Sequence, residues 1–393
     1  MRFALLTMCA AALAACSDAK APTEPATRKS APSLPTDHRP GATPSAIDSR
    51  PVSVQLEELV TRRFSGVRLP ADSFSLSPDA VHPDIACRTG WNGSRCWLLY
   101  TPYKNSDPSY ENPAFLVARD DTAWATPPEV RNPIISFPGP GRYNSDPDHA
   151  FDPATGRLVQ VYRLVTASSN NIMIMSTGTA RQWSEPTLAF DEPNHDAVSP
   201  SLIIEPDRTG RMWYVRTGPT GCQARASTVQ LRTAQPPPAA YFENAKWSAP
   251  APVTMSIPGY VVWHIDVAEL PVGGYLAFIA AFPVGTTCSN SDLWLATSPD
   301  GIAWRNFAIP LLWRGMAIAR DRSISTWYRG TIRYDADGDT LHLWPSALSN
   351  RSWSVYHVAL PLDQTLRLLA MARPSDMRAL KKIPPKPATI PMP

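Results

Sequence analysis

The chain has 393 residues, of which 44% are hydrophobic, and 37 basic and 34 acidic residues give it a net charge of only +3. The charges are spread along the chain, which gives no reason to expect a nucleic-acid partner. The 43 prolines and the scarcity of helical periodicity predict many short strands joined by turns, an all-β fold.

The first 15 residues, MRFALLTMCAAALAA, have the pattern of a secretory signal peptide. Arg2 precedes an apolar run that ends in small residues and is too short to span a membrane. Residues 13–16, Leu-Ala-Ala-Cys, resemble the bacterial lipobox, which implies cleavage before Cys16 and lipidation of Cys16. The non-acidic Ser17 then implies the outer membrane of a Gram-negative cell. An ordinary secreted protein that is cleaved nearby is the alternative.

Proline-rich segments flank the core. Residues 16–52 begin with the lipidated cysteine and continue as a Pro/Ala/Ser/Thr-rich sequence, which predicts an extended tether. Residues 373–393 are rich in Pro and Lys and are expected to form a solvated tail. The globular domain is therefore predicted to span residues 53–372.

Four cysteines remain in this domain once Cys9 and Cys16 are set aside. An even number of cysteines in an oxidising compartment predicts two disulfides. Cys87 pairs most easily with Cys96 across a local hairpin, which leaves Cys222 to pair with Cys288. A metal site is the alternative, but the sequence has neither Cys-x-x-Cys nor histidines at ligand spacing.

The domain contains a repeat of about 60 residues. Each unit begins with an apolar strand that is preceded by polar residues, and a Gly or Asp turn and further strands follow. The units are 64, 53, 65 and 65 residues apart when aligned at Asp84, Asp148, Ser201, Asp266 and Thr331. Four-stranded antiparallel units at this period predict a five-bladed β-propeller, because only a neighbouring blade can cover each blade's apolar face. Six blades are the alternative.

Two further segments have expected places in the propeller. Residues 52–69 are expected to pack beside the last blade or add a strand to it, and that blade is expected to end near TLRLLA (365–370). The turn TSPDGIAW (297–304) resembles the Asp-box of sialidases. The resemblance implies a structural role, in which Asp300 caps the turn and Trp304 packs between strands.

Polar residues stand at the heads of the first strands. These strands line the channel of a propeller, so their heads are expected to meet at one mouth. Aromatic and carboxylate side chains together suit a glycan ligand. The candidate residues are His82, Asp84, Asp146, Asp148, His195, Asp196, His264, Asp266, Tyr328 and Arg329, with Tyr103, Glu111 and Trp263 nearby.

The architecture and the blade-head acids resemble the five-bladed propeller glycoside hydrolases of the family 43 clan, the arabinanases and xylosidases. HPDI matches their general base and implies that Asp84 activates water. NSDPD matches the acid that tunes its pKa, which implies Asp148 or Asp146. The third blade, NHDAVSPSLI, lacks their general-acid Glu, which leaves Asp196 or, on the fourth blade, His264.

The segments TPY (101–103), YENP (110–113) and NSDPDHAFDPATGRL (144–158) also resemble a group of bacterial and phage-associated propeller proteins. This resemblance bears on the fold more than on an activity.

The leading hypothesis is a monomeric cell-surface lipoprotein that hydrolyses a glycosidic bond by carboxylate acid–base catalysis, with a carbohydrate as its ligand. It would contact the membrane through its lipid anchor only. A non-catalytic glycan-binding propeller is the first alternative. A sialidase-like hydrolase is the second, and it would need an arginine triad. No cofactor is predicted, since the sequence has no phosphate loop or metal-ligand spacing, although a channel Ca²⁺ would be consistent with some relatives.

Replacement of the lipobox cysteine tests the membrane anchor. We expect Cys16→Ser to abolish acylation and to release the protein from the membrane fraction, because the acyl chains supply the anchoring energy. Metabolic labelling with an alkyne fatty acid in a Gram-negative host, followed by membrane fractionation, measures both effects. Ser17→Ala is the matched control and keeps the label. A labelled Cys16→Ser protein would contradict the prediction.

Overall fold

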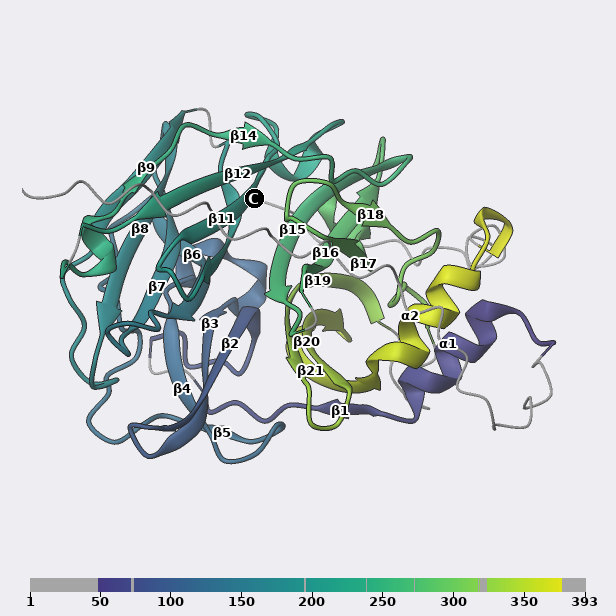
Figure 1. Cartoon of the computed structure of the whole chain (residues 1–393), viewed down its shortest axis with the longest axis horizontal. Coiled ribbons are helices and arrows are strands. Elements are labelled where there is room, and N and C mark those ends of the chain that lie inside the picture. Colours follow the sequence, from purple (N-terminus) through teal and green to yellow (C-terminus); the bar gives the residue numbers. More distant parts are fainter. Residues whose placement is uncertain are drawn as a thin grey trace, which may run out of the picture. The chain divides into compact units, whose positions relative to one another are not determined.

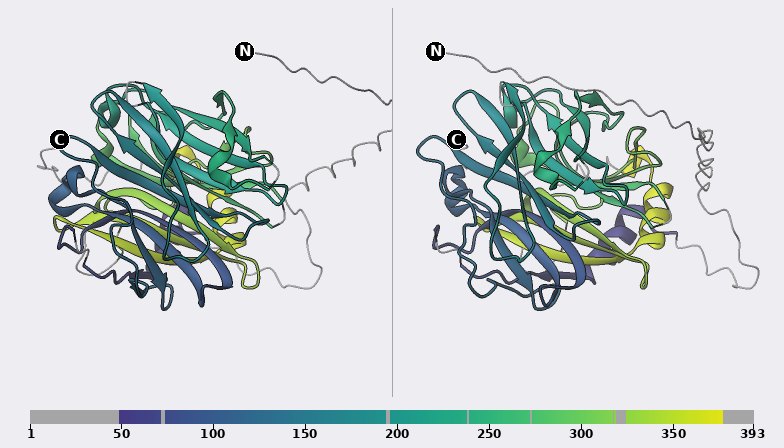
Figure 2. Two further views of the ribbon diagram at one scale, coloured as in Figure 1. Left: turned by 90° about the vertical axis from the view of Figure 1, so that its left-hand side faces the viewer. Right: turned by 60° about the vertical axis from the view of Figure 1, so that its left-hand side comes forward.

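The computed structural model describes residues 49–71, 74–193, 196–237, 239–271, 273–316, 318 and 324–376. Five antiparallel sheets follow one another in chain order, as the colours show (Figures 1 and 2). Their innermost strands contact each other in a closed ring. The predicted five-bladed β-propeller is therefore confirmed, and the six-bladed alternative is wrong.

The first four blades are built from consecutive strands, numbered from the channel outward. Blade one has β2 (Ala80–Trp91), β3 (Ser94–Pro102), β4 (Ala114–Ala118) and β5 (Trp124–Ala125). Blade two has β6 (Tyr143–Phe151), β7 (Leu158–Val165), β8 (Ser169–Thr177) and β9 (Thr187–Pro193). Blade three has β10 (Val198–Ile204), β11 (Gly210–Arg216), β12 (Thr228–Gln235) and β13 (Lys246–Trp247), with β14 (Ala251–Pro252) also paired to β12. Blade four has β15 (Tyr260–Glu269), β16 (Tyr275–Pro283), β17 (Asp292–Ser298) and β18 (Arg305–Asn306).

Blade five combines both ends of the domain. Its inner strands are β19 (Ile324–Asp335), β20 (Thr340–Ser349) and β21 (Ser352–Pro361), and its outermost strand is β1 (Phe64–Gly66). Phe64 pairs with Val358 of β21. The expectation that residues 52–69 add a strand to the last blade is confirmed, and this pairing closes the ring with backbone hydrogen bonds.

Two helices flank this joint, and they lie side by side in Figure 1. They are α1 (Val52–Thr61) and α2 (Leu362–Met371). TLRLLA thus lies in α2, which corrects the expectation that it ends blade five as a strand. Its buried residues Thr365, Leu368 and Leu369 follow helical spacing, and the strand position they were expected to fill is taken by β1.

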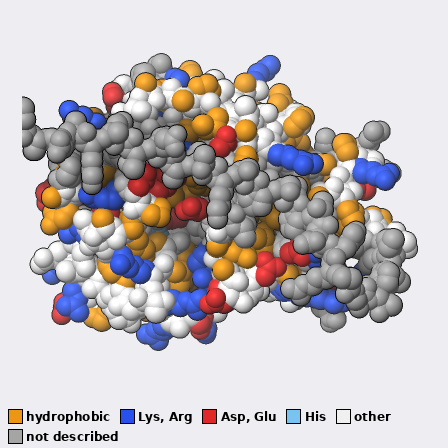
Figure 3. Space-filling model, viewed as in Figure 1, with side chains coloured by type: hydrophobic (Ala, Val, Ile, Leu, Met, Phe, Trp, Pro, Cys, Tyr) orange, Lys and Arg blue, Asp and Glu red, His pale blue; other side chains and the backbone are white. Residues whose placement is uncertain are grey.

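Short 3₁₀ turns occur in the connections between strands. They are η1 (Lys104–Ser106), η2 (Pro108–Tyr110), η3 (Gly221–Gln223), η4 (Phe242–Asn244) and η5 (Cys288–Asn290). Within the described ranges, none of the helices has the length and apolarity needed to cross a membrane. On the face shown in Figure 3, acidic and basic side chains are interspersed with apolar ones.

A ring of hydrogen bonds joins the five innermost strands, β2, β6, β10, β15 and β19. In each strand, one side chain accepts the backbone N–H of the next blade. The bonds run from His149 N to Asp84 Oδ2 (2.7 Å), Leu202 N to Asp148 Oδ1 (2.8 Å), Val267 N to Ser201 Oγ (2.9 Å), Ile332 N to Asp266 Oδ2 (2.8 Å) and Ile85 N to Thr331 Oγ1 (3.4 Å). The acceptors are the five residues at which the sequence repeat aligns. Each satisfies a buried donor that would otherwise destabilise the fold.

The Asp-box turn has its expected structural role. Asp300 Oδ1 accepts the N–H groups of Ile302 and Ala303, each at 2.8 Å. The buried Trp304 donates from its indole nitrogen to the carbonyl of Gly301 at 2.9 Å. This turn therefore fixes the β17–β18 connection of blade four.

Both predicted disulfides are present. Cys87–Cys96 lies across the β2–β3 hairpin of blade one, and Cys222–Cys288 joins η3 to η5. The first closes a segment with a sequence separation of 9 residues and the second one of 66 residues. The second disulfide therefore joins the β11–β12 loop of blade three to the β16–β17 loop of blade four and closes the longer segment.

Removal of the two disulfides should affect stability unequally. In the chain-entropy model, replacing Cys222 and Cys288 by alanine lowers the free energy of unfolding by about 4 kcal/mol, against about 3 kcal/mol for the Cys87/Cys96 pair. Urea unfolding of both double variants and of the unmutated protein measures the difference. An equal or larger loss for Cys87/Cys96 would show that loop length does not control the effect.

Candidate functional site

A β-bulge interrupts each innermost strand just before its ring acceptor. Two residues before each acceptor, the five blades place His82, Asp146, Ser199, His264 and Arg329. His82, Asp146 and Ser199 have left-handed backbones, with φ of 52°, 49° and 54°. A left-handed backbone conformation is energetically unfavourable for residues other than glycine. It occurs where the surrounding structure must hold a side chain in a particular direction. The bulges therefore build a second tier of polar side chains.

Three members of this tier converge. His82 Nε2 lies 3.1 Å from Asp146 Oδ1, and His264 Nδ1 lies 3.9 Å from the same oxygen. All three side chains are buried. Among the described residues, these three converging atoms have no hydrogen-bond partner. Buried polar atoms are nearly always paired, so this group is unusual.

Two residues behind His82 fix its orientation. His82 Nδ1 lies 3.0 Å from Thr101 Oγ1 and 3.3 Å from Glu111 Oε2. Both oxygens can accept a proton held on Nδ1, and in that tautomer Nε2 offers a lone pair. That lone pair then faces the carboxylate of Asp146. Two acceptors this close require a positive charge between them or beside them.

The surroundings of the group shift the pKa values of its members in different directions. Burial alone raises the pKa of Asp146, but the Arg163 guanidinium outweighs it and holds this pKa well below its usual range. Arg163 Nε lies 3.1 Å from Asp146 Oδ2. Burial lowers the pKa of His264 well below its usual value and raises that of Glu111. The group therefore combines an ionised carboxylate with a neutral imidazole.

His82, Asp146 and His264 fit a divalent transition-metal ion. Each offers one ligand atom, and these atoms lie within 4.8 Å of one another. A central ion binds histidine and carboxylate ligands at about 2.0–2.2 Å, which such spacing permits. Thr101 and Glu111 occupy the supporting positions that orient a metal-binding histidine. The sequence predicted no metal site because the three residues come from three different blades.

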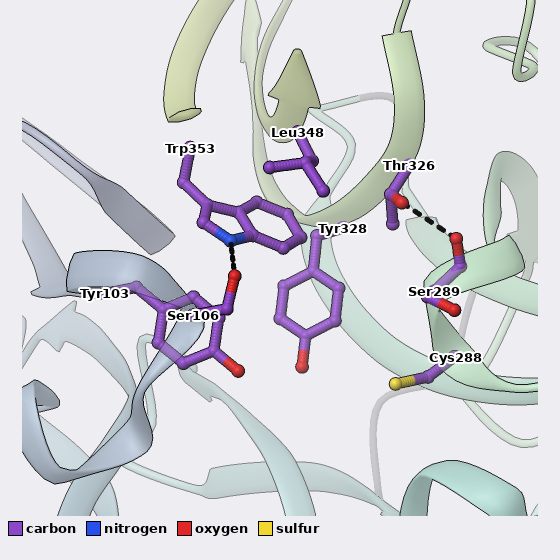
Figure 4. Close-up of a pocket in the computed structure, with 8 residues that line it drawn as sticks. All are labelled: Tyr103, Ser106, Cys288, Ser289, Thr326, Tyr328, Leu348 and Trp353. Atoms are coloured by element: carbon purple, nitrogen blue, oxygen red, sulfur yellow. Dashed lines mark hydrogen bonds between the residues drawn. The ribbon is translucent and has the colours of Figure 1, made fainter. Parts of the chain in front are cut away.

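A small pocket opens beside this group (Figure 4). It is lined by Tyr103, Ser106, Cys288, Ser289, Thr326, Tyr328, Leu348 and Trp353. The Tyr328 ring lies 4.6 Å from the ring of His264 and 5.3 Å from that of His82, measured between centroids. Burial raises the pKa of Tyr328, so its hydroxyl remains a hydrogen-bond donor at neutral pH. Tyr328 thus connects the pocket with the buried group.

Aromatic rings also gather around Tyr110, the residue before Glu111. Phe74 is 6.0 Å from Tyr110 and 5.8 Å from Phe137 between ring centroids. Phe74 is 38% exposed and Phe137 is 40% exposed. Exposed aromatic faces of this kind are suited to stacking against sugar rings.

A second buried group comprises three ring acceptors, Asp84, Asp148 and Asp266, which offer oxygens within 4.8 Å of one another. Arg329 Nη2 donates to Asp148 Oδ2 at 2.9 Å and supplies positive charge to the group. Burial, and then Asp84, raise the pKa of Asp266 to about 7 and raise that of Asp148. Asp84 accepts from Thr331 at 3.1 Å as well as from the backbone and imidazole of His149. Asp84 is therefore tied into the inter-blade ring.

The structure brings most of the predicted site residues together, with two departures. Asp196 instead pairs with Arg216 (2.8 Å) and accepts the Gly218 N–H (2.6 Å), because it precedes β10 and faces the β11 end. His195 lies outside the described residues, as does Cys16. Trp263 packs edge-on against His264 with 5.1 Å between ring centroids.

The sialidase-type alternative needs three arginines around one carboxylate, whereas the arginines at or near the blade heads pair with different carboxylates of the protein. Arg329 pairs with Asp148, Arg163 with Asp146 and Arg216 with Asp196. Each cation is thus neutralised by a different carboxylate of the protein.

The sequence did not identify Thr101 or Trp353 as residues of the mouth, and it considered Arg163 only for the sialidase-type alternative. Arg163 did carry a signal, since it is a charge inside the apolar strand sequence LVQVYRLV. A charge inside a buried strand normally has a buried partner. Thr101 and Glu111 lie in the TPY and YENP segments, so those segments meet at His82.

No protein-family model matches the chain. A curated relative, the A type blood N-acetyl-alpha-D-galactosamine deacetylase of Flavonifractor plautii, is 25% identical over 328 residues. The match covers 71% of this chain but only 41% of that protein, so the chain spans about two fifths of its relative's length.

Solved structures share the fold. The crystal structure of an N-acetylgalactosamine deacetylase from F. plautii, in complex with blood group B trisaccharide, has a TM-score of 0.68 at 21% identity. It covers 78% of this chain and 96% of that chain. A thermostable family-43 glycoside hydrolase has a TM-score of 0.50 at 12% identity and covers 75% and 91% of the two chains. The expected likeness to family-43-type propellers is thus confirmed at the level of the fold.

Proposed function

We propose that this propeller is a glycan-active hydrolase that removes the acetyl group of an N-acetylated amino sugar, assisted by a divalent cation. One observation carries the proposal: three buried and unpartnered ligand atoms, from His82, Asp146 and His264, converge beside the pocket. The similarity to a curated N-acetylgalactosamine deacetylase supports the choice of bond. Location at the outer membrane, through a lipid on Cys16, is part of the proposal and rests on the lipobox resemblance.

The reaction adds a water oxygen to the amide carbonyl, breaks the C–N bond and yields acetate and an amine. A divalent cation held by His82, Asp146 and His264 would polarise the carbonyl as a Lewis acid. The proton of the attacking water ends on the leaving nitrogen, while Glu111, behind His82, orients that imidazole. Tyr328 donates its hydroxyl proton in a hydrogen bond to the carbonyl oxygen as negative charge develops there.

The neighbouring residues keep this machinery in place. Arg163 holds Asp146 ionised, and Thr101 keeps the imidazole of His82 in one orientation. The exposed rings of Phe74 and Phe137 offer stacking surfaces for further sugars of the same glycan.

Loss of a ligand side chain should abolish acetate release. We expect His264→Ala and Asp146→Asn each to lower kcat/KM at least about 100-fold, because both remove a direct metal ligand. A chelator should inactivate the unmutated enzyme, and Zn²⁺ or Mn²⁺ should restore it. The measurement is free acetate released from oligosaccharides that carry N-acetylgalactosamine or N-acetylglucosamine, with mass spectrometry of the glycan product.

Matched variants separate catalysis from folding. Glu205→Gln makes the same carboxylate-to-amide change in an ion pair with Arg211 and should leave acetate release unchanged. Glu111→Gln should weaken metal binding about tenfold or more, because it removes a partner that orients His82. Full activity in the presence of chelator, or with Asp146→Asn, would refute the proposal.

Glycoside hydrolysis is the second candidate, and the close group of Asp84, Asp148 and Asp266 favours it. That reaction uses two carboxyl groups about 5–9.5 Å apart, whereas oxygens of this group lie within 4.8 Å of one another. In this chain, however, Asp84 already accepts hydrogen bonds from Thr331 and His149. These bonds suit an inter-blade tie better than a base that must meet water.

Asp84→Asn distinguishes the two reactions. Under the deacetylase proposal, the variant loses about 1–3 kcal/mol of stability, since a buried hydrogen-bond set is disturbed, and folded protein still releases acetate. Under the glycosidase alternative, it binds glycan but no longer shortens it. Urea unfolding, acetate release and product length on the same substrates decide between them. Binding with neither product would instead favour a non-catalytic glycan-binding propeller.

A further inference from the structure

A second cluster of metal-type side chains lies at the joint between blades five and one. Its members are His342 on β20, His357 on β21 and Asp121 in the turn between β4 and β5. One donor atom from each lies within 4.8 Å of the others. Since β4 runs away from the end of β3 that leads to Tyr103, this turn is remote from the mouth.

The two imidazoles are positioned by one tryptophan. His342 Nδ1 lies 3.0 Å from His357 Nε2 and 3.9 Å from Asp121 Oδ2. The Trp344 ring stacks on both histidines, at 5.7 and 4.9 Å between centroids. Its indole nitrogen also donates to the Asp121 carbonyl at 3.0 Å. Trp344 therefore holds the turn of blade one against the histidines of blade five.

The charges around the cluster allow a cation. Burial lowers the pKa of both histidines, that of His357 to about 4, so both are in the neutral form that binds metals. Arg333 Nη2 lies 3.9 Å from Asp121 Oδ1, whereas His342 faces Oδ2 of the same carboxylate. Arg333 also lies 3.9 Å from Asp335, which shares its charge.

We propose that Asp121, His342 and His357 form a second divalent-metal site, which binds a zinc-type ion and joins blade one to blade five. Two imidazole nitrogens and one carboxylate oxygen suit Zn²⁺ or Co²⁺, whereas Mg²⁺ and Ca²⁺ prefer oxygen ligands alone. The Asp121 side chain is 46% exposed, which gives the ion an entry path and leaves room for water. The ion adds a cross-blade link at the joint that β1 closes.

Cobalt titration of the full chain, stripped of metal with a chelator, tests the site through visible absorption. The unmutated protein should bind two equivalents, one at the mouth and one here. His264→Ala should retain one, His357→Gln should retain one, and the double variant should bind none. If the mouth binds no metal, the unmutated protein binds a single equivalent, which persists in His264→Ala and disappears in His357→Gln.

Two changes beside the histidines test the site and leave both imidazoles in place. In the His264→Ala background, Asp121→Asn should weaken Co²⁺ binding at least about tenfold. Arg333→Gln should strengthen binding, because it removes a nearby like charge. Zn²⁺, but not Mg²⁺, should raise the thermal unfolding midpoint in that background, and adding His357→Gln should remove the rise.

Unchanged Co²⁺ stoichiometry and affinity in both Asp121→Asn and His357→Gln would overturn the proposal. Such a result would make the histidines a hydrogen-bonded pair of the blade core. If His357→Gln does not fold, the opposite shifts expected for Asp121→Asn and Arg333→Gln decide the question alone.

Discussion

The ring of side-chain-to-backbone hydrogen bonds around the channel is the interaction on which the rest of the structure depends. Each innermost strand has a bulge, and the neighbouring blade satisfies the buried N–H group that follows. The carboxylates of this ring have two acceptor oxygens, so Asp84 can bond to both blade two and blade five. Because Thr331 of blade five accepts from Ile85 of blade one, the hydrogen bonds form a closed circle.

The bulges that accompany this ring also position the polar residues at the mouth of the channel. The same bulges hold His82 and Asp146 in left-handed backbone conformations that would be unfavourable in an isolated strand. Burying several polar groups together is costly unless opposite charges accompany them. Arg163 supplies that charge for Asp146, and Arg329 supplies it for Asp148. The first tier, the ring acceptors, therefore joins neighbouring blades. The second tier, two residues earlier in each strand, contains the cluster whose ligand atoms have no hydrogen-bond partner among the described residues.

Some features could be predicted well because they depend on local pattern or covalent chemistry. The repeat period specified the number of blades and even the five equivalent ring positions. The cysteine count and the hairpin around Gly90 and Gly93 specified the disulfide pairs. The Asp-box turn was predicted correctly because its hydrogen bonds all lie within a few residues of Asp300. Helix α2 was missed because TLRLLA is apolar enough to suit a strand, and only its packing against α1 settles the matter.

The sequence by itself determined the fold class, the blade count and a set of acids, histidines and aromatics that had to face one channel. Only the tertiary structure decided which of them share a cluster. A bulge breaks the two-residue alternation of a strand, so counting positions cannot tell whether His82 or Asp84 meets Asp146. Clusters such as His82, Asp146 and His264 draw their members from blades far apart in the chain. Their distances are therefore set by ring closure, which leaves no trace in local sequence spacing.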